Sequence, residues 1–154
     1  MRLSKSVTVS NQLAQVRHKS PAPAINAHLV SIACAQNGQK EQWLSPFADD
    51  AVVHDPVGPS PHDPTGEGFT GKRRLAEFWD LMIGPNTMVI TSHKQIAAGP
   101  ADCACIVTAT NHFGENLIVD IEMIVTYQVN EEGLITSLKA YWDLSAVAEQ
   151  LGGG

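Results

Sequence analysis

Apolar residues in the first half of the chain recur at the spacing of a helix. They predict a helix over residues 21–36, with Ser20 as its N-cap and Pro21 at its first position. The apolar stripe of this helix consists of Ile25, Leu29, Ile32 and Ala33. A short helix is expected at 39–45 and a third at 72–82, so three helices precede most of the strands.

Long runs of β-branched and aromatic residues fill the second half of the chain, with turn residues between them, and predict four strands. These runs lie at 88–97, 103–112, 117–129 and 134–144. A shorter strand is expected at 52–54, and residues 56–71, with four prolines and four glycines, are expected to form a loop. Helices first and an antiparallel meander last is an α+β order. The predicted fold is a curved antiparallel or mixed sheet, wrapped as a cone around three N-terminal helices and open at one end to an apolar pocket.

The length and the charge of the chain describe one acidic domain with a basic start. The 154 residues suit a single domain at 21–148, between a tail at 1–20 and a flexible end at 149–154. The formal net charge is −6, yet residues 1–40 hold five basic and no acidic residues. The tail is either a solvated segment or a targeting peptide. The acidic remainder is a poor phosphate binder and no apolar run is long enough to span a membrane, so neither nucleic acid nor a membrane is expected as a partner.

Cysteines and histidines give no sign of a metal or cofactor site. The chain has three cysteines, and Cys103 and Cys105 are expected to point to opposite faces of one strand. We expect all three to stay reduced, as in a cytoplasmic protein. The histidines are scattered without helical metal-ligand spacing, and the motifs for nucleotides, nicotinamide cofactors or a nucleophilic serine are absent. The sequence therefore predicts no metal and no cofactor.

Three short segments carry the most specific pattern in the chain. They read FADDAVVHDPVG at 47–58, GKRRLAEFW at 71–79 and AYW at 140–142. Together they resemble the ketosteroid isomerase (steroid delta-isomerase) branch of the superfamily that is called nuclear transport factor 2-like or SnoaL-like. The resemblance covers about residues 25–148 and implies the cone-shaped α+β fold. It also implies a homodimer that pairs through the outer face of the sheet, for which the exposed-face residues are expected to be Ile118, Ile124 and Ile135.

Asp55 stands where this branch keeps the base that shuttles a proton. By the resemblance, the carboxylate takes a proton next to a ketone and returns it two carbons away, which moves a double bond into conjugation. A carboxylate at the edge of an apolar pocket has a raised pKa, because burial disfavours its charged form. On the sequence alone, Asp55 and Pro56 also fit a simple turn in which the carboxylate caps backbone amides.

The acid partners of that base do not match the family pattern. The branch has a tyrosine in its first helix and a protonated aspartate in its third long strand, and the corresponding positions here are Ser31 and Val125. His28, one helical turn before Ser31, is either a longer donor or a partly exposed helix residue. The resemblance and strand alternation also assign a group of substrate-binding residues, and both of its tryptophans fit a core position as well. The full group is Ser31, Trp79, Ile106, Met123, Val125, Tyr127 and Trp142.

These residues leave three functional hypotheses open. The first is an isomerase without a cofactor, which acts on a flat, apolar, steroid-like ketone with Asp55 as its base. The second is a protein of the same fold that binds a steroid-like or polyketide-like ligand and performs no chemistry, which the residues Ser31 and Val125 favour. The third is a cyclase, dehydratase or epoxide hydrolase on the same scaffold, which would need a further His, Arg or Asp in the pocket.

Overall fold

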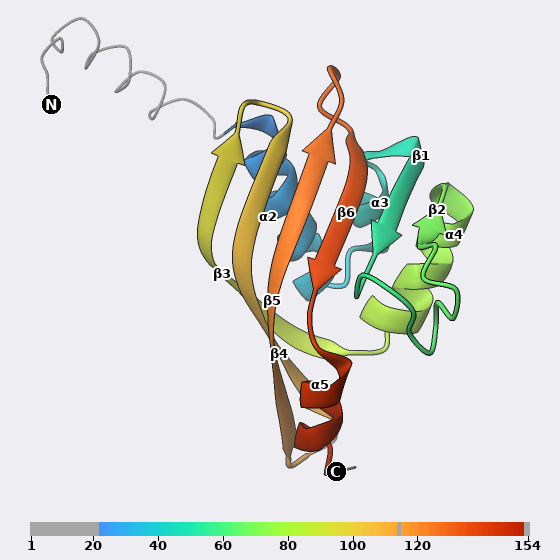
Figure 1. The fold of residues 1–154 in the computed structure, drawn as a ribbon, viewed down its shortest axis with the longest axis vertical. Helices are drawn as coiled ribbons and strands as arrows, with labels where there is room; N and C mark the ends of the chain where they lie inside the picture. Colours follow the sequence, from blue (N-terminus) through green and yellow to red (C-terminus); the bar gives the residue numbers. More distant parts are fainter. Residues whose placement is uncertain (1–21, 114, 153–154) are drawn as a thin grey trace, which may run out of the picture.

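A curved sheet with helices behind one face forms the body of the protein (Figure 1). The computed structural model describes residues 22–152 except residue 114. The helices are α2 (Pro23–Gln36), α3 (Lys40–Leu44), α4 (Lys72–Phe78), the π-helical turn η1 (Trp79–Ile83) and α5 (Leu144–Gln150). The strands are β1 (Phe47–His54), β2 (Phe69–Thr70), β3 (Thr87–Ala98), β4 (Asp102–Phe113), β5 (Leu117–Val129) and β6 (Ile135–Tyr141). They form one sheet in the order β2-β1-β6-β5-β4-β3, in which β1 and β6 are parallel and the other neighbours antiparallel.

The predicted α+β fold is confirmed, with a curved mixed sheet and helices on the N-terminal side. One edge of the sheet differs from the prediction. β1 is longer than the expected strand at 52–54, and β2 forms inside the expected loop at 56–71, where it pairs with Val52 and Val53. The predicted N-cap Ser20 lies outside the described residues, as does the tail at 1–20. The first helix begins two residues later than predicted, at Pro23, with Ala22 as its N-cap.

The C-terminal segment forms a helix where the sequence predicted the end of a strand. α5 follows β6 because Asp143 Oδ1 accepts a 2.8 Å hydrogen bond from the Ser145 amide and so caps a helix. Gln150 then holds α5 against β5, since its side chain bonds both the amide and the carbonyl of Asp120. α5 therefore continues past the predicted domain boundary at 148.

The inner face of the long strands is buried against the helices. On β5 it includes Val125 and Tyr127, which lie beside Cys105 and Cys103 of β4. Cys103 and Cys105 thus share one face, and their sulfur atoms are 3.9 Å apart. The expectation that they point to opposite faces is wrong, because residues two positions apart on a strand face the same way.

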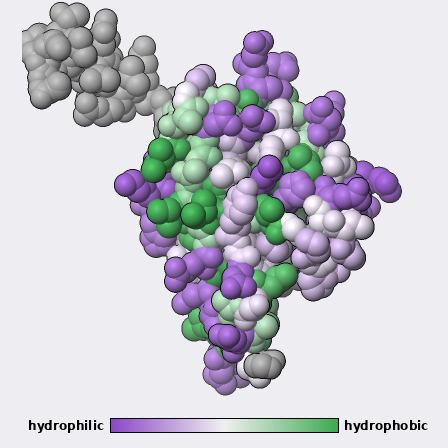
Figure 2. Space-filling view, in the orientation of Figure 1, coloured by the Kyte–Doolittle hydropathy of each residue, from purple (hydrophilic) through white to green (hydrophobic). Residues whose placement is uncertain are grey.

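The outer face of the sheet exposes a row of large apolar side chains. Ile106, Ile124 and Tyr141 are direct neighbours across β4, β5 and β6, and each is about half exposed. Figure 2 looks onto this face and shows apolar residues gathered over the strands. Ile118 is also exposed, but Ile135, which was expected among the exposed residues, is fully buried. We call Ile106, Ile124 and Tyr141 the outer-face row.

An aromatic cluster fills the space between α3, α4 and β1. Trp43 packs on Phe47, Phe78 and Trp79 with ring centroids 4.8 to 6.0 Å apart, and Phe69 packs on Phe78 at 5.3 Å. Burying each of these rings contributes about 1.5–3 kcal/mol to stability. The cluster thus holds α3 and α4 against β1, the strand that pairs in parallel with β6. Within the described part of the chain, no helix has the length and hydropathy to cross a membrane.

Candidate functional site

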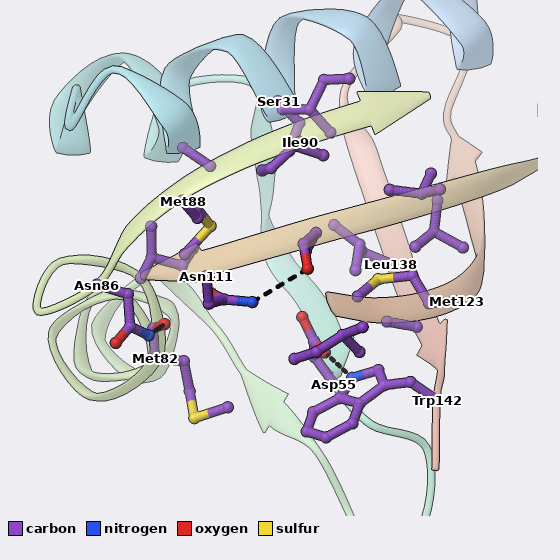
Figure 3. Close-up of a pocket in the computed structure, with 18 of the residues that line it drawn as sticks. Ser31, Asp55, Met82, Asn86, Met88, Ile90, Asn111, Met123, Leu138 and Trp142 are labelled. Atoms are coloured by element: carbon purple, nitrogen blue, oxygen red, sulfur yellow. Dashed lines mark hydrogen bonds between the residues drawn. The ribbon is translucent and has the colours of Figure 1, made fainter. Parts of the chain in front are cut away.

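A cavity of about 250 Å³ lies between α2 and the inner face of the sheet. Its wall is mostly aliphatic, aromatic and methionine side chains. The polar side chains on the wall are Ser31, Asp55, Asn86, Asn111, Tyr127 and Trp142. In Figure 3, Asp55 and Trp142 lie together on one side of the cavity, Asn86 lies on the opposite side, and Asn111 appears between them. An apolar cavity with a few convergent polar groups is typical of a small-molecule site.

Asp55 enters this cavity from the residue that follows β1. Its Oδ1 accepts a 2.5 Å hydrogen bond from the indole Nε1 of Trp142, which follows β6 (Figure 3). If the Asp55 carboxylate capped the turn at Pro56, it would accept a hydrogen bond from the Val57 amide. That amide donates instead to the Ala140 carbonyl at 2.9 Å. The side chain of Asp55 therefore faces the cavity and the indole, and not the turn at Pro56.

The surroundings of Asp55 make it a stronger base than an ordinary aspartate. Burial raises the pKa of Asp55 to about 6, and the hydrogen bond from Trp142 opposes part of this rise. Near neutral pH the group is thus mostly ionised, and it still binds a proton more tightly than a solvated carboxylate. A base with a pKa close to the working pH is suited to take and return a proton.

Tyr127 contributes a second oxygen to the cavity wall. The residue is 4% exposed, and burial raises the pKa of its phenol well above the ordinary value. A hydrogen bond with Ser31 of α2 lowers the pKa of the phenol, and the negative charge of Asp55 raises it. Ser31 and Asp55 are thus both close enough to the phenol to affect its pKa.

His28 lies behind Tyr127 and not at the surface. It is fully buried, its ring centroid is 5.2 Å from that of Tyr127, and its Nε2 is hydrogen-bonded to Ser92 Oγ at 2.8 Å. Burial lowers the pKa of His28 to about 4, so the imidazole is neutral at physiological pH. Its side chain is not on the cavity wall, and the interpretation as a partly exposed helix residue is wrong.

The structure brings together six of the eight residues that the sequence assigned to the site. The side chains on the cavity wall are those of Ser31, Asp55, Met123, Val125, Tyr127 and Trp142. Trp79 is not on the cavity wall, and its indole packs behind that wall on Trp43 at 5.5 Å. Ile106 is 49% exposed and belongs to the outer-face row, since its strand neighbours Cys105 and Val107 occupy the inner face. Trp79 and Ile106 therefore differ from the prediction.

Sequence reasoning missed the two asparagines of the cavity. Asn111 is 4% exposed, and its Nδ2 donates to the Ala109 carbonyl at 3.2 Å. Asn86 Nδ2 donates to the Met82 carbonyl at 2.6 Å, just before β3. Strand alternation could have found Asn111, because it lies four residues after Val107 and hence on the same face. Nothing in the local pattern distinguishes Asn86 from an ordinary turn residue.

The two buried thiols of β4 have raised pKa values. Burial raises the pKa of Cys105 to about 12 and also raises that of Cys103, so both thiols stay protonated. Among residues 22–152, with 114 left out, His, Cys, Asp and Glu do not gather in groups of three or more that could hold a metal ion. The polar side-chain atoms on the wall of the described cavity are oxygens and nitrogens.

Comparisons with known proteins agree with this geometry. A family model described as a SnoaL-like domain matches residues 31–138. The structure of Rv0760c from Mycobacterium tuberculosis is 33% identical, covers 84% of this chain and 97% of its own, and superimposes with a TM-score of 0.79. A second structure of Rv0760c, in complex with estradiol-17beta-hemisuccinate, is 33% identical over 82% of this chain and 98% of its own, with a TM-score of 0.76. The Δ5-3-ketosteroid isomerase from Mycobacterium sp. is 36% identical over 82% of this chain and 97% of its own, with a TM-score of 0.76. No curated protein matched the sequence.

Proposed function

This chain belongs to the SnoaL-like domain family, and we propose that it is a cofactor-independent isomerase of flat, apolar, steroid-like ketones. The observation that carries this proposal is Asp55, a carboxylate with a pKa of about 6 on the wall of an otherwise apolar cavity. Two similar structures support the substrate class, since one is a ketosteroid isomerase and the other holds a steroid ester.

The proposed reaction moves one proton and one double bond. The Asp55 carboxylate takes a proton from the carbon between the carbonyl and the β,γ double bond, and the electron pair of that C–H bond moves towards the carbonyl oxygen to form a dienolate. The protonated Asp55 then gives its proton to the far carbon, and the carbonyl re-forms with the double bond in conjugation. Atoms and electrons balance without an oxidant or reductant. A pKa of about 6 suits Asp55 for both steps, because neither protonation state is strongly disfavoured near neutral pH.

The wall of the cavity supports an apolar ligand with a polar group at each end. Asp55 and Trp142 provide polarity near the end of β1, and Asn86 and Asn111 provide it near the far end of β4 (Figure 3). Val125 of β5, which lies beside Asp55, pairs with Cys105 of β4. Asn111 is six residues further along β4 than Cys105, or about 20 Å along the strand. A rigid polycyclic molecule with an oxygen at either end fits this arrangement.

The first test is turnover of 5-androstene-3,17-dione, followed by the ultraviolet absorbance of the conjugated enone. Asp55→Asn keeps an oxygen that can accept the Trp142 bond but removes the base, so we expect turnover to be abolished and steroid binding to remain. Asp50→Asn is the matched control, because Asp50 is exposed on β1, the strand that Asp55 follows. An Asp55→Asn variant as active as the parent would refute the proposed role of Asp55.

The alternative is a steroid-binding or polyketide-binding protein without chemistry. Ser31 and Val125 favour it, since neither offers the acidic donor that the family has at these positions. Quenching of tryptophan fluorescence by the product steroid, in the absence of any turnover, would favour this alternative. Loss of both binding and turnover would exclude a steroid-like ligand for either function.

The outer-face row supports a homodimer, which is part of the proposal. Ile106, Ile124 and Tyr141 are exposed beside acidic Glu122 on one flank and basic Lys139 on the other. In a two-fold symmetric dimer the outer-face rows of the two copies would pack on each other in antiparallel orientation. Each Glu122 would then approach Lys139 of the other copy. For the location of the protein, the buried free thiols of the chain support a reducing compartment such as the cytoplasm.

A further inference from the structure

Tyr127 lies one row deeper in the cavity than Asp55. Inner-face residues form rows across the sheet, and Tyr127 pairs with Leu138 of β6, whereas Val125 pairs with Ala140. Asp55 follows His54, the partner of Lys139, and therefore lies at the level of Ala140. One row corresponds to two residues, or about 7 Å along the strand. Tyr127 is 4% exposed, whereas Phe113 at the other end of the cavity wall is 37% exposed, so the closed end is the one at Tyr127. A ligand whose reacting carbon lies beside Asp55 can thus direct an oxygen on the adjacent carbon towards Tyr127.

The hydroxyl of Tyr127 can donate a hydrogen bond into the cavity. Tyr127 and Ser31 are both on the cavity wall and interact with each other, and each hydroxyl carries one hydrogen that it can donate. Burial raises the pKa of the phenol, so the proton remains on Tyr127 at any physiological pH. The His28 ring behind Tyr127, 5.2 Å away between centroids, packs against the phenol ring on the side of α2.

Three other donors of the cavity already make hydrogen bonds within the protein. The Trp142 indole N–H donates to Asp55 itself. The amides of Asn86 and Asn111 donate to the Met82 and Ala109 carbonyls and lie towards the other end of β4. Val125, beside Asp55 in the same row, has no polar side-chain atom.

We propose that the Tyr127 hydroxyl, positioned by Ser31, is the hydrogen-bond donor to the ligand oxygen at the deep end of the cavity. This inference rests on the proposed function, in which that oxygen is the ketone oxygen. When Asp55 removes the proton, the electron pair moves to this oxygen, and the hydrogen bond from Tyr127 strengthens as the negative charge grows. The proton of Tyr127 is not transferred, so Tyr127 stabilises the dienolate and Asp55 alone carries the proton.

The kinetic test is Tyr127→Phe, which removes only the hydroxyl. Because the bond is stronger to the dienolate than to the ketone, we expect kcat to fall by about 10²–10³-fold with KM nearly unchanged. Tyr141→Phe is the matched control, since Tyr141 is the only other tyrosine of the chain and lies in the outer-face row. Ser31→Ala should give a smaller loss of kcat, and no further loss when it is combined with Tyr127→Phe. Circular dichroism checks that each variant is folded.

A binding test separates this inference from the proposed function. Estradiol offers a phenol oxygen in place of the dienolate oxygen, and its 3-deoxy analogue lacks that oxygen. Tyr127→Phe should weaken estradiol binding about 5–10-fold and leave binding of the deoxy analogue unchanged, as expected for the loss of one hydrogen bond. This result would support the inference even if the parent protein turned over no ketone.

Two outcomes overturn the inference. If Asp55→Asn is inactive while Tyr127→Phe keeps the full kcat, the proposed function stands and the role of Tyr127 is wrong. If the parent has no turnover and Tyr127→Phe binds estradiol as tightly as the parent, both proposals fail. Equal losses for estradiol and its deoxy analogue would show that Tyr127 acts only through packing, which also contradicts the inference.

Discussion

Replacing Asp55 by asparagine should stabilise the protein while it removes the proposed base. Burial raises the pKa of Asp55 from 3.8 to about 6, which means that folding at neutral pH carries a cost for the ionised carboxylate. Two pKa units correspond to about 3 kcal/mol, which is an upper limit because the side chain is partly exposed in the cavity and solvent screens its charge. The amide that replaces the carboxylate would carry no charge and could still accept the Trp142 hydrogen bond. We therefore expect a gain of about 1–2 kcal/mol in the free energy of unfolding at neutral pH.

The pH dependence of this gain identifies its cause. The native state binds the Asp55 proton more tightly than the unfolded state, so the parent is least penalised below pH 3.8 and loses stability as the pH rises from about 4 to about 6. The asparagine variant does not lose this stability. Urea denaturation of both proteins should therefore show a difference at about pH 7.5 that shrinks towards zero at about pH 4. Asp50→Asn changes an exposed residue of β1, the strand that Asp55 follows, and should show no such gain.

The outcome that would refute this reasoning is a variant no more stable than the parent at neutral pH. A gain of the same size at both pH values would also contradict it, because the cause would then be packing and not the buried charge. A gain that follows the pH, together with lost turnover, would show that the protein keeps an unfavourable charge in its cavity for the sake of chemistry.

Three further predictions concern the same site and the outer-face row. The value of kcat/KM should fall about tenfold per pH unit below about pH 6, where Asp55 becomes protonated, and a profile that is flat down to pH 5 would contradict its role as the base. Trp142→Phe removes the hydrogen bond that lowers the pKa of Asp55, so the acidic limb of that profile should move to higher pH, and an unmoved limb would show that the bond does not act on the base. Ile124→Asp places a charge in the centre of the outer-face row and should convert a dimer into a monomer in light scattering, whereas a parent that is already monomeric would contradict the dimer.

The position of Tyr127 shows when residue alternation can predict which face of a strand is buried. On β5 the two sets of alternating residues differ in polarity, with Asp120 and Glu122 in one set and Val125 and Tyr127 in the other. Alternation separated the two sets, and the family resemblance assigned the second one to the pocket. On β4 both sets are apolar around Ile106, and the sequence assigned this residue to the wrong face. Periodicity can separate two faces only where one of them is polar.

Trp79 and α5 show two other limits. A buried tryptophan satisfies the same helical pattern whether it borders a cavity or fills a core, and the packing of Trp79 on Trp43 depends on a helix more than thirty residues earlier in the chain. The strand predicted to end at 144 stops earlier because Asp143 caps α5, a signal that was present in the sequence but was outweighed by the apolar run around it.

The sequence by itself determined the α+β order, the two-residue periodicity of the long strands and the position of Asp55 at the end of β1. These features depend on local spacing and turn chemistry, which a linear chain contains in full. Only the tertiary structure decided what Asp55 can do. Its bond to Trp142 joins residues 87 positions apart, and its raised pKa comes from the helices and strands that exclude water around it. Desolvation and the convergence of Asp55, Tyr127 and Ser31 on one cavity are properties of packing, and so they exist only once distant segments have come together.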